Sequence, residues 1–182
     1  MPKKLWEPSK GLKKNSNLFA YEKFISKYYK YNLSRNYTKL LKWSVNNPKD
    51  FWNSIWKYFE VIGIKTNKFK LTKDLINSKF FVNSKLNFTE NLLVKNSNQK
   101  AITFVSENGY REQKSWKELN IDVKKIITFY KKINISEKDR IAAYTPNQIE
   151  TVECFLSASA IGAIWSSCCL LYTSPSPRDR SI

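Results

Sequence analysis

The sequence predicts an α/β protein, in which a helical N-terminal region is followed by the truncated start of a large domain built on a parallel sheet. Two observations predict this class. Apolar residues recur at helical spacing in the first third of the chain, and from residue 101 onward short apolar runs alternate with amphipathic segments. The second pattern, in the order hairpin, helix, strand, helix, strand, is typical of domains whose helices cover a parallel sheet.

An amphipathic helix is predicted over residues 17–32. Leu18, Tyr21, Ile25 and Tyr28 follow one another at steps of three and four, which places them on one face. Such a stripe is most often the buried face of a helix. The alternative is that the tyrosines and the lysines between them bind a single nucleic-acid strand, by stacking on its bases and neutralising its phosphates.

A second helix, over residues 48–62, is predicted from its boundaries as well as from its spacing. Asn47 can cap the first turn, Pro48 suits the first helical position, and Gly63 is expected to end the helix. The large apolar side chains of this segment are Phe51, Trp52, Ile55, Trp56 and Phe59. So many rings on a short helix require burial against a larger partner, which predicts a docking element.

The alternating region begins at residue 101, after a stretch that is predicted to be mostly loop. Two extended runs around Asn108 and Gly109 predict a hairpin, because this dipeptide favours the tight turn between antiparallel strands. Ser115, with Glu118 three residues later, forms a capping box that opens a helix ending at about Ile133. The remaining predicted elements are a strand at 139–145, a helix at 147–162 that Gly162 closes, and a strand at 163–168.

The net charge of +17 is the most prominent bulk property and raises the question of a nucleic-acid partner. However, 27 of the 32 basic residues are Lys and only 5 are Arg, the residue that binds phosphate and guanine through two hydrogen bonds at once. Asn, with 18 residues, is overused together with Lys, which indicates a genome rich in A and T. The charge is therefore interpreted as a lysine-coated surface, and no specific nucleic-acid partner is predicted.

The composition excludes several functional classes. The chain has no His, which excludes Ser-His-Asp and Cys-His catalysis and metal sites that depend on imidazole. Cys154, Cys168 and Cys169 cluster late and form no C-x-x-C pair, which argues against a disulfide framework and favours a reducing, cytoplasmic compartment. There is no secretory signal and no apolar run that could span a bilayer, so no membrane partner is predicted.

Glu150 and Glu153 lie three residues apart and share one face of a predicted helix. This face is interpreted as solvated, and the two carboxylates are not interpreted as an acid–base pair.

The sequence resembles the adenylate-forming acyl-CoA synthetases in six blocks that occur in the family's order and spacing: LWEPS, KWSVNNPKDFWNSIWKYFEV, FFVNSKLNFTENLL, KSWKELN, DRIAAYTPNQIETV and ASAIGAIWSSC. The blocks LNFTENLL and GAIWSSC favour the acetoacetyl-CoA synthetase branch over the otherwise similar acetyl-CoA synthetases. The resemblance extends from about Leu5 to Cys168 and therefore covers most of the chain.

This resemblance implies a cytoplasmic, AMP-forming ligase that makes acetoacetyl-CoA from acetoacetate, CoA and ATP through an acyl-adenylate. ATP, Mg²⁺ and CoA would be bound by the full-length parent. In the family, the phosphate loop, the metal-binding carboxylate, the nucleotide pocket and the adenylating lysine all lie downstream of the matched stretch. We therefore expect this fragment to contain no catalytic, cofactor-binding or metal-binding residue, to bind no cofactor and to be inactive by itself. The alternatives are a fragment of an acetyl- or propionyl-CoA synthetase and a basic, aromatic nucleic-acid-binding module.

Four segments are predicted: an N-terminal arm and helix at 1–34, the acyl-CoA synthetase N-terminal region at 35–94, the truncated start of the AMP-binding (adenylation) domain at 95–169, and a foreign tail at 170–182. The tail contains neither Lys nor Asn, whereas about one residue in four before it is one of these two. Its Tyr-Thr-Ser segment is similar to the opening of the family's phosphate loop. Pro175 and Pro177, however, stand where such a loop needs free φ angles and N–H donors. The gene is expected to continue in frame from about Cys168 with a block similar to SPDFG.

Overall fold

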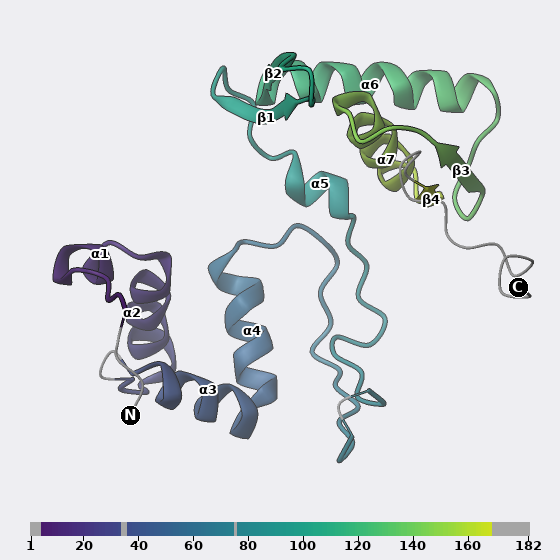
Figure 1. Ribbon diagram of the computed structural model, residues 1–182. Coiled ribbons are helices and arrows are strands. Elements are labelled where there is room, and N and C mark those ends of the chain that lie inside the picture. The colour runs from purple at the N-terminus through teal and green to yellow at the C-terminus, as the bar shows by residue number, and fades with distance from the viewer. Residues whose placement is uncertain (1–4, 34–35, 75, 169–182) are drawn as a thin grey trace, which may run out of the picture. The chain divides into compact units, whose positions relative to one another are not determined.

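The computed structural model describes residues 5–33, 36–74 and 76–168, and the contacts of the chain divide it into two compact units, Met1–Ser84 and Lys85–Ile182 (Figure 1). The predicted foreign tail lies outside the described residues. Helices make up the regular structure described in the first unit, whereas the second unit combines helices with two pairs of strands. This arrangement confirms the predicted class of a helical N-terminal region followed by an α/β segment.

The helices of the first unit are α1 (Lys10–Lys14), α2 (Asn17–Tyr29), α3 (Tyr37–Asn46) and α4 (Pro48–Tyr58). A polar side chain caps the start of α1, α2 and α3. Ser9, Ser16 and Asn36 each accept a hydrogen bond from the backbone N–H three residues later, which satisfies a donor that the first turn would otherwise leave free. The sequence pattern did not indicate α1 or α3.

The core of the first unit lies where α2, α3 and α4 meet. Tyr21 and Ile25 of α2 pack with Leu40 and Trp43 of α3 and with Leu33 of the connecting segment. All five side chains are less than a tenth exposed. The helix predicted over residues 17–32 is thus confirmed, with a slightly earlier end. Of its predicted apolar stripe, Tyr21 and Ile25 are buried in this core, whereas Leu18 and Tyr28 are 43% and 48% exposed.

Helix α4 differs from the prediction in the role of the Asn47 side chain and in the place where the helix ends. Asn47 does not cap α4 with its side chain, because Asn47 Nδ2 donates to the carbonyl oxygen of Trp43 at 3.1 Å and so closes α3. Gly63 does not end the helix either. The last helical residue is Tyr58, and Glu60, two residues later, has a positive φ of 50° that interrupts the helical backbone. The predicted Pro48 start is confirmed.

The ring-rich helix α4 buries two sides within its own unit. Phe51 and Ile55 pack against the core formed by α2 and α3. On another side, Trp52 and Trp56 meet aromatic rings of the segment 64–84, with centroids 5.3 and 5.0 Å apart. Tilted and edge-on ring pairs at these separations stabilise a fold beyond simple burial. The segment 64–84, whose described residues form no long helix or strand, is thereby held on α4.

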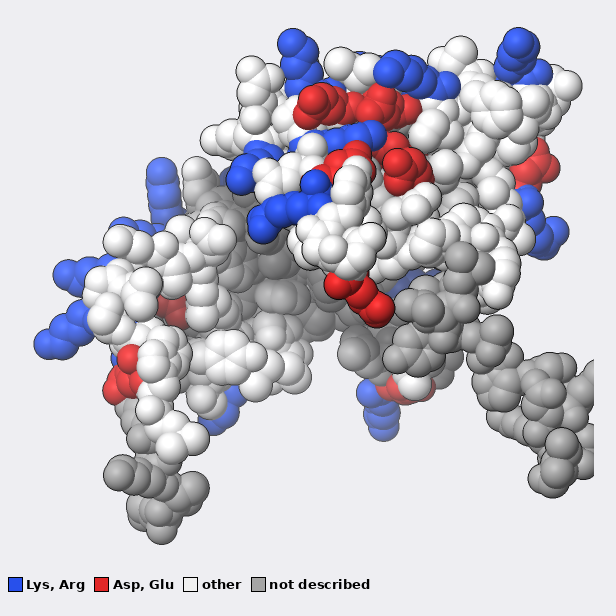
Figure 2. Space-filling model, turned by 45° about the horizontal axis from the view of Figure 1, so that its top comes forward, with Lys and Arg blue, Asp and Glu red and all other residues white. Residues whose placement is uncertain are grey.

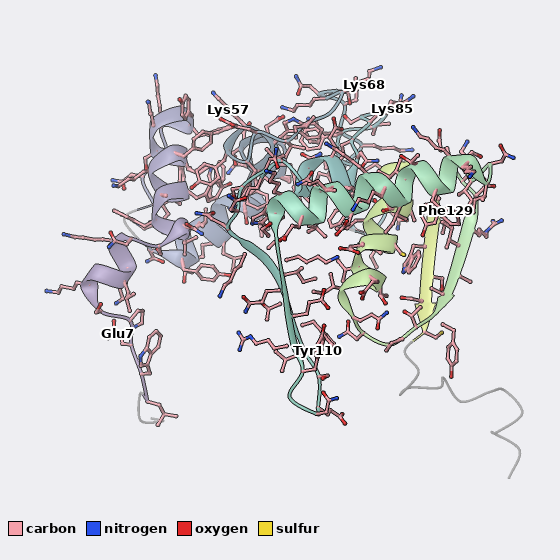
Figure 3. The ribbon with its side chains drawn as sticks, turned by 90° about the horizontal axis from the view of Figure 1, so that it is seen from above. Glu7, Lys57, Lys68, Lys85, Tyr110 and Phe129 are labelled. Carbon is pink, nitrogen blue, oxygen red and sulfur yellow. The ribbon has the colours of Figure 1, made fainter. Side chains whose placement is uncertain are left out.

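The elements of the second unit are α5 (Phe88–Leu92), β1 (Lys100–Val105), β2 (Arg111–Ser115), α6 (Trp116–Lys132), β3 (Arg140–Tyr144), α7 (Ile149–Ala160) and β4 (Ile164–Cys168). Strands β1 and β2 pair in antiparallel fashion, and Gly109 in their connection has a φ of 83°. The predicted hairpin around Asn108 and Gly109 is therefore confirmed. Figure 3 shows this hairpin projecting from the start of α6, with Tyr110 near its tip.

The predicted capping box at the start of α6 is also confirmed. The backbone N–H of Glu118 donates to Ser115 Oγ at 3.2 Å, and the Glu118 carboxylate accepts from the Ser115 N–H at 2.8 Å. These two bonds satisfy donors at the first turn, and the carboxylate also lies at the positive end of the helix dipole. The helix runs to Lys132, and Ile133 is its C-cap, as the pattern predicted.

Strands β3 and β4 are parallel and in register from the pair Arg140 and Ile164 to the pair Tyr144 and Cys168. Helix α7 connects them and packs against α6 (Figure 1). The predicted strand–helix–strand unit of a parallel sheet is confirmed. Gly162, which has a φ of 77°, ends α7 as predicted, and a Cβ there would come within 3.0 Å of Glu137 Cγ.

Helix α5 and the residue before it form a clasp on α7. Asn87 Nδ2 donates to the carbonyl oxygens of Ser159 and Ala160 at 2.9 and 3.2 Å, and Thr89 Oγ1 donates to that of Leu156 at 2.7 Å. These carbonyl oxygens lie in the last turns of α7, which leave several acceptors without a partner inside the helix. The clasp lies within the predicted region 35–94, and its partners belong to the α/β segment.

Candidate functional site

A charged cluster joins β2, α6 and α7 in the second unit. Lys114 Nζ lies 2.6 Å from Glu153 Oε1 and 2.9 Å from Asp122 Oδ2, while Lys125 Nζ lies 2.9 Å from Asp122 Oδ1. The Glu153 side chain is only 4% exposed and that of Lys114 is 19% exposed, whereas Lys125 is largely in solvent. Figure 2 shows acidic and basic side chains interleaved on the face of this unit that is turned toward the viewer.

Burial and charge pairing shift the pKa values of the groups in this cluster in opposite directions. Burial by itself would lower the pKa of the Lys114 ammonium, but hydrogen bonds to Glu153 and Asp122 raise that pKa well above its usual range. Burial raises the pKa of Glu153, against the opposing effect of Lys114. Lys125 first, and then Lys114, lower the pKa of Asp122. The lysine therefore stays charged and neutralises a carboxylate that has almost no contact with water.

The interpretation of Glu150 and Glu153 as a solvated face is wrong for Glu153. Glu150 is exposed, but Glu153 is 3% exposed as a residue and is paired with Lys114 from a strand 39 positions earlier. Lys114 and Asp122 were missed in the sequence for the same reason. A contact over this separation leaves no local spacing signal, and lysines are abundant throughout the chain.

We expect the ionisation of Asp122 to make the stability of the second unit depend on pH. Because its folded pKa lies below the ordinary value of 3.8, its ionised form stabilises the folded state fully above that pH, and this contribution is lost as the pH falls through the lowered pKa. We expect Asp122→Asn to flatten the acid side of the stability curve below about pH 4. Urea unfolding between pH 2 and 7 measures this slope. Glu107→Gln, at an exposed position, is the control, and equal flattening by both variants would contradict the assignment.

A groove of about 500 Å³ lies beside the carboxyl end of β3. Residues 102–107 form one side, and residues 146–149 with Val152 form the other. Ligands of parallel α/β sheets commonly bind at this end of the strands. Glu107 is the only ionisable side chain among these lining residues, so the lining presents neither an acid–base pair nor a nucleophile beside a base.

The described residues do not fit the cofactors that the resemblance implies for the parent. Within residues 5–33, 36–74 and 76–168, no three His, Cys, Asp or Glu side chains come together as a metal site requires. The lining of the groove offers no pair of glycines for a phosphate-binding turn. No step of a reaction is therefore derived from these side chains, and the absence of site residues stays a prediction.

The tyrosines at the end of α2 and just after it do not share one exposed face. Tyr29 and Tyr31 have their rings against Trp43, with centroids 5.7 and 6.0 Å apart. Tyr28, which is 48% exposed, packs on Phe24, and Lys57 Nζ lies 3.8 Å from the centre of its ring. Because these rings already have protein partners in different directions, they form no common platform on which successive bases could stack.

We therefore expect weak binding of single-stranded DNA that falls steeply with salt, since counterion release is then its main driving force. Replacing Tyr28 by Ala is expected to leave this binding unchanged within about twofold, whereas loss of a stacking contact costs about 1–3 kcal/mol. Fluorescence anisotropy with a labelled oligonucleotide, at increasing NaCl, measures both effects. Tight binding that resists salt and requires Tyr28 would favour the nucleic-acid-binding module instead.

Comparison with known proteins finds a matching family model and several similar proteins. The family model described as the acetyl-coenzyme A synthetase N-terminus matches residues 37–92. An acetoacetyl-coenzyme A synthetase from Rhizobium meliloti (strain 1021) is 30% identical over 165 residues, which cover 90% of this chain and 25% of that protein. An acetoacetyl-CoA synthetase from Gallus gallus is 31% identical over 170 residues, with the same two shares.

The fold agrees with these sequence matches. The solved acetoacetyl-CoA synthetase from Streptomyces lividans superposes with a TM-score of 0.84 over 92% of this chain and 27% of its own length, at 21% identity. No helix among the described residues is long and apolar enough to cross a membrane. The chain spans about a quarter of the length of the relatives that it matches. Residues 37–92 match the family model of the acetyl-coenzyme A synthetase N-terminus, and the chain is similar to the acetoacetyl-CoA synthetases over nine tenths of its length.

Proposed function

We propose that this chain is the N-terminal part of a cytoplasmic, AMP-forming ligase that joins acetoacetate to CoA. In this reaction the acetoacetate carboxylate attacks the α-phosphate of ATP, which releases pyrophosphate and forms an acyl-adenylate. The CoA thiolate then attacks the acyl carbon, and AMP leaves. The observation that supports this proposal is similarity to acetoacetyl-CoA synthetases across 90% of the chain, in proteins from a bacterium and a vertebrate.

The proposed parent uses ATP, Mg²⁺ and CoA, with acetoacetate as the acyl donor. We assign the chemistry to the part of the parent that corresponds to the uncovered length of the relatives, because this chain covers only a quarter of that length. On this proposal residues 1–34 form an arm and helix, residues 35–94 the N-terminal region, and residues 95–169 the start of the adenylation domain. Residues 170–182 would not belong to the parent.

The test is ATP–pyrophosphate exchange by the complete gene product, with acetoacetate, acetate and propionate offered separately. We expect exchange with acetoacetate to be at least about tenfold faster than with the other two acids, a ratio within the reach of ordinary pocket discrimination. The chain of residues 1–182, assayed in parallel, is expected to give no exchange. Preference for acetate or propionate would favour the alternative synthetases, and exchange by residues 1–182 alone would place the active site inside this chain.

A further inference from the structure

The segment 64–84 of the first unit doubles back on itself after α4 (Figure 1). The N–H of Lys70 donates to the carbonyl oxygen of Lys79 at 2.9 Å, and the N–H of Lys79 donates back to that of Lys70 at 2.7 Å. Beyond this bridge the N–H of Thr72 donates to Ser78 Oγ at 3.0 Å. We call the whole segment the lysine loop, and the described residues 71–74 and 76–78 its tip.

Side chains alternate between two directions on the arms that lead to the tip. Phe69 and Phe80 are partly buried, with ring centroids 6.4 Å apart, and Phe80 also meets a tryptophan of α4 at 5.3 Å. Their neighbours Lys68, Lys70 and Lys79 are exposed. Because successive side chains of extended backbone point to opposite faces, the phenylalanines face α4 and the lysines face away from it.

The exposed face of the lysine loop carries positive charge that the described residues do not neutralise. Asp74 is the loop's only carboxylate, and it accepts from the N–H of Ile76 at 3.0 Å and from Asn77 Nδ2 at 2.7 Å. Lys70 and Lys79 stand directly opposite each other, where like charges oppose pairing. Within the described parts of the chain, no ion pair involves any lysine of the loop, namely Lys65, Lys68, Lys70, Lys73 and Lys79.

The tip adds exposed aliphatic side chains to this charge. Ile76 is 91% exposed and Leu71 is 38% exposed. Aliphatic side chains cannot stack on nucleic-acid bases as aromatic rings do, and the phenylalanines on the arms of the loop face α4. Apolar side chains beside lysines are instead typical of segments that lie on an anionic bilayer, where the apolar groups enter the lipid and the lysines contact the headgroups.

Charge and apolar surface therefore indicate one kind of partner for the lysine loop. We propose that the loop binds the surface of an anionic phospholipid bilayer, with Ile76 inserted among the lipids and Lys70 and Lys79 against their headgroups. Each lysine close to such a surface strengthens binding by about fivefold. A second copy of the loop would instead oppose two positive faces. The sequence predicts no membrane partner because it contains no spanning segment, but a loop on the surface does not span the bilayer.

Flotation of the complete gene product with lipid vesicles tests the role of the charge. We expect the protein to float with vesicles of phosphatidylcholine mixed with phosphatidylserine, but not with phosphatidylcholine alone, and to be released by NaCl. Lys70→Gln combined with Lys79→Gln is expected to weaken binding about tenfold or more. The matched control, Lys39→Gln combined with Lys42→Gln, removes the same charge from exposed positions of α3 and is expected to have little effect.

Fluorescence tests the insertion of the tip. An environment-sensitive fluorescent amino acid placed at Ile76 is expected to shift its emission to the blue when the mixed vesicles are added. The same group at Val45, which is 67% exposed on α3, is the control and is expected to show no shift. Ile76→Ser is expected to weaken flotation about fivefold, because an inserted isoleucine contributes through the apolar area it removes from water.

Several results would overturn this inference. They are equal flotation with both kinds of vesicle, equal losses from the two lysine pairs, and emission at Ile76 that is already blue-shifted without vesicles. Binding of soluble poly-glutamate by a protein that floats with neither vesicle would assign the lysine loop to an acidic protein and reject the membrane. ATP–pyrophosphate exchange is measured on the same preparations. Its absence would reject the proposed function alone, because binding to the bilayer does not depend on the acyl substrate.

Discussion

Replacing Lys114 by Met is expected to destabilise the second unit by about 3–5 kcal/mol near neutral pH, the cost of leaving a buried charge without its partner. Glu153 would remain 4% exposed with no cation beside it. Its folded pKa, already raised by burial, would rise further above the unfolded value. Stability of the variant should therefore fall as the pH rises between these two values, so the loss is smaller at pH 4 than at pH 7. Urea unfolding followed by circular dichroism at both pH values measures the effect.

Two further variants separate a buried ion pair from a surface one. Lys125→Met removes the other lysine on Asp122, but Lys125 is 71% exposed, and its loss is expected to cost less than about 1 kcal/mol. Lys114→Met combined with Glu153→Leu removes both buried charges and is expected to recover most of the lost stability, because no unpaired charge remains. If Lys114→Met costs no more than Lys125→Met, the cluster does not stabilise the fold as described.

The elements that the sequence predicts correctly are those whose determinants are local. The capping box of Ser115 and Glu118 spans four residues, and the turn at Gly109 needs a positive φ that glycine adopts without strain. The parallel pair β3 and β4 follows from the alternation of short apolar runs with a helix that Gly162 closes. Each of these signals is complete within one short stretch of sequence.

The features that the sequence did not reveal depend on contacts between separate elements of the fold, or on apolar residues that do not follow a single helical period. Apolar residues lie on two faces of α3, so its periodicity does not match a single amphipathic stripe. Asn47 has the right chemistry for a cap, and only the short distance between α3 and α4 decides which helix it serves. Glu153 and Lys114 meet because α7 packs beside β2, which no spacing along the chain encodes.

Asn87 is the second position at which a large effect is expected. Its Oδ1 accepts from the N–H of Glu90 at 3.1 Å as the cap of α5, and its Nδ2 donates to two carbonyl oxygens at the end of α7. Asn87→Ala removes all three bonds and is expected to lower the free energy of unfolding by about 2–3 kcal/mol. About 1 kcal/mol of this loss comes from the cap, and the remainder comes from the two bonds to α7. Urea unfolding measures the change.

Asn87→Asp distinguishes the clasp from a simple helix cap. Aspartate is as good a cap as asparagine, so a role limited to α5 predicts almost no loss. In the clasp, however, the carboxylate cannot donate to the carbonyl oxygens of Ser159 and Ala160, and its charge faces their negative ends. We therefore expect Asn87→Asp to be at least as destabilising as Asn87→Ala at pH 7. Below about pH 4 it should recover, because the protonated carboxyl can donate again. A stable Asp variant at neutral pH would show that the contact with α7 contributes little to the fold.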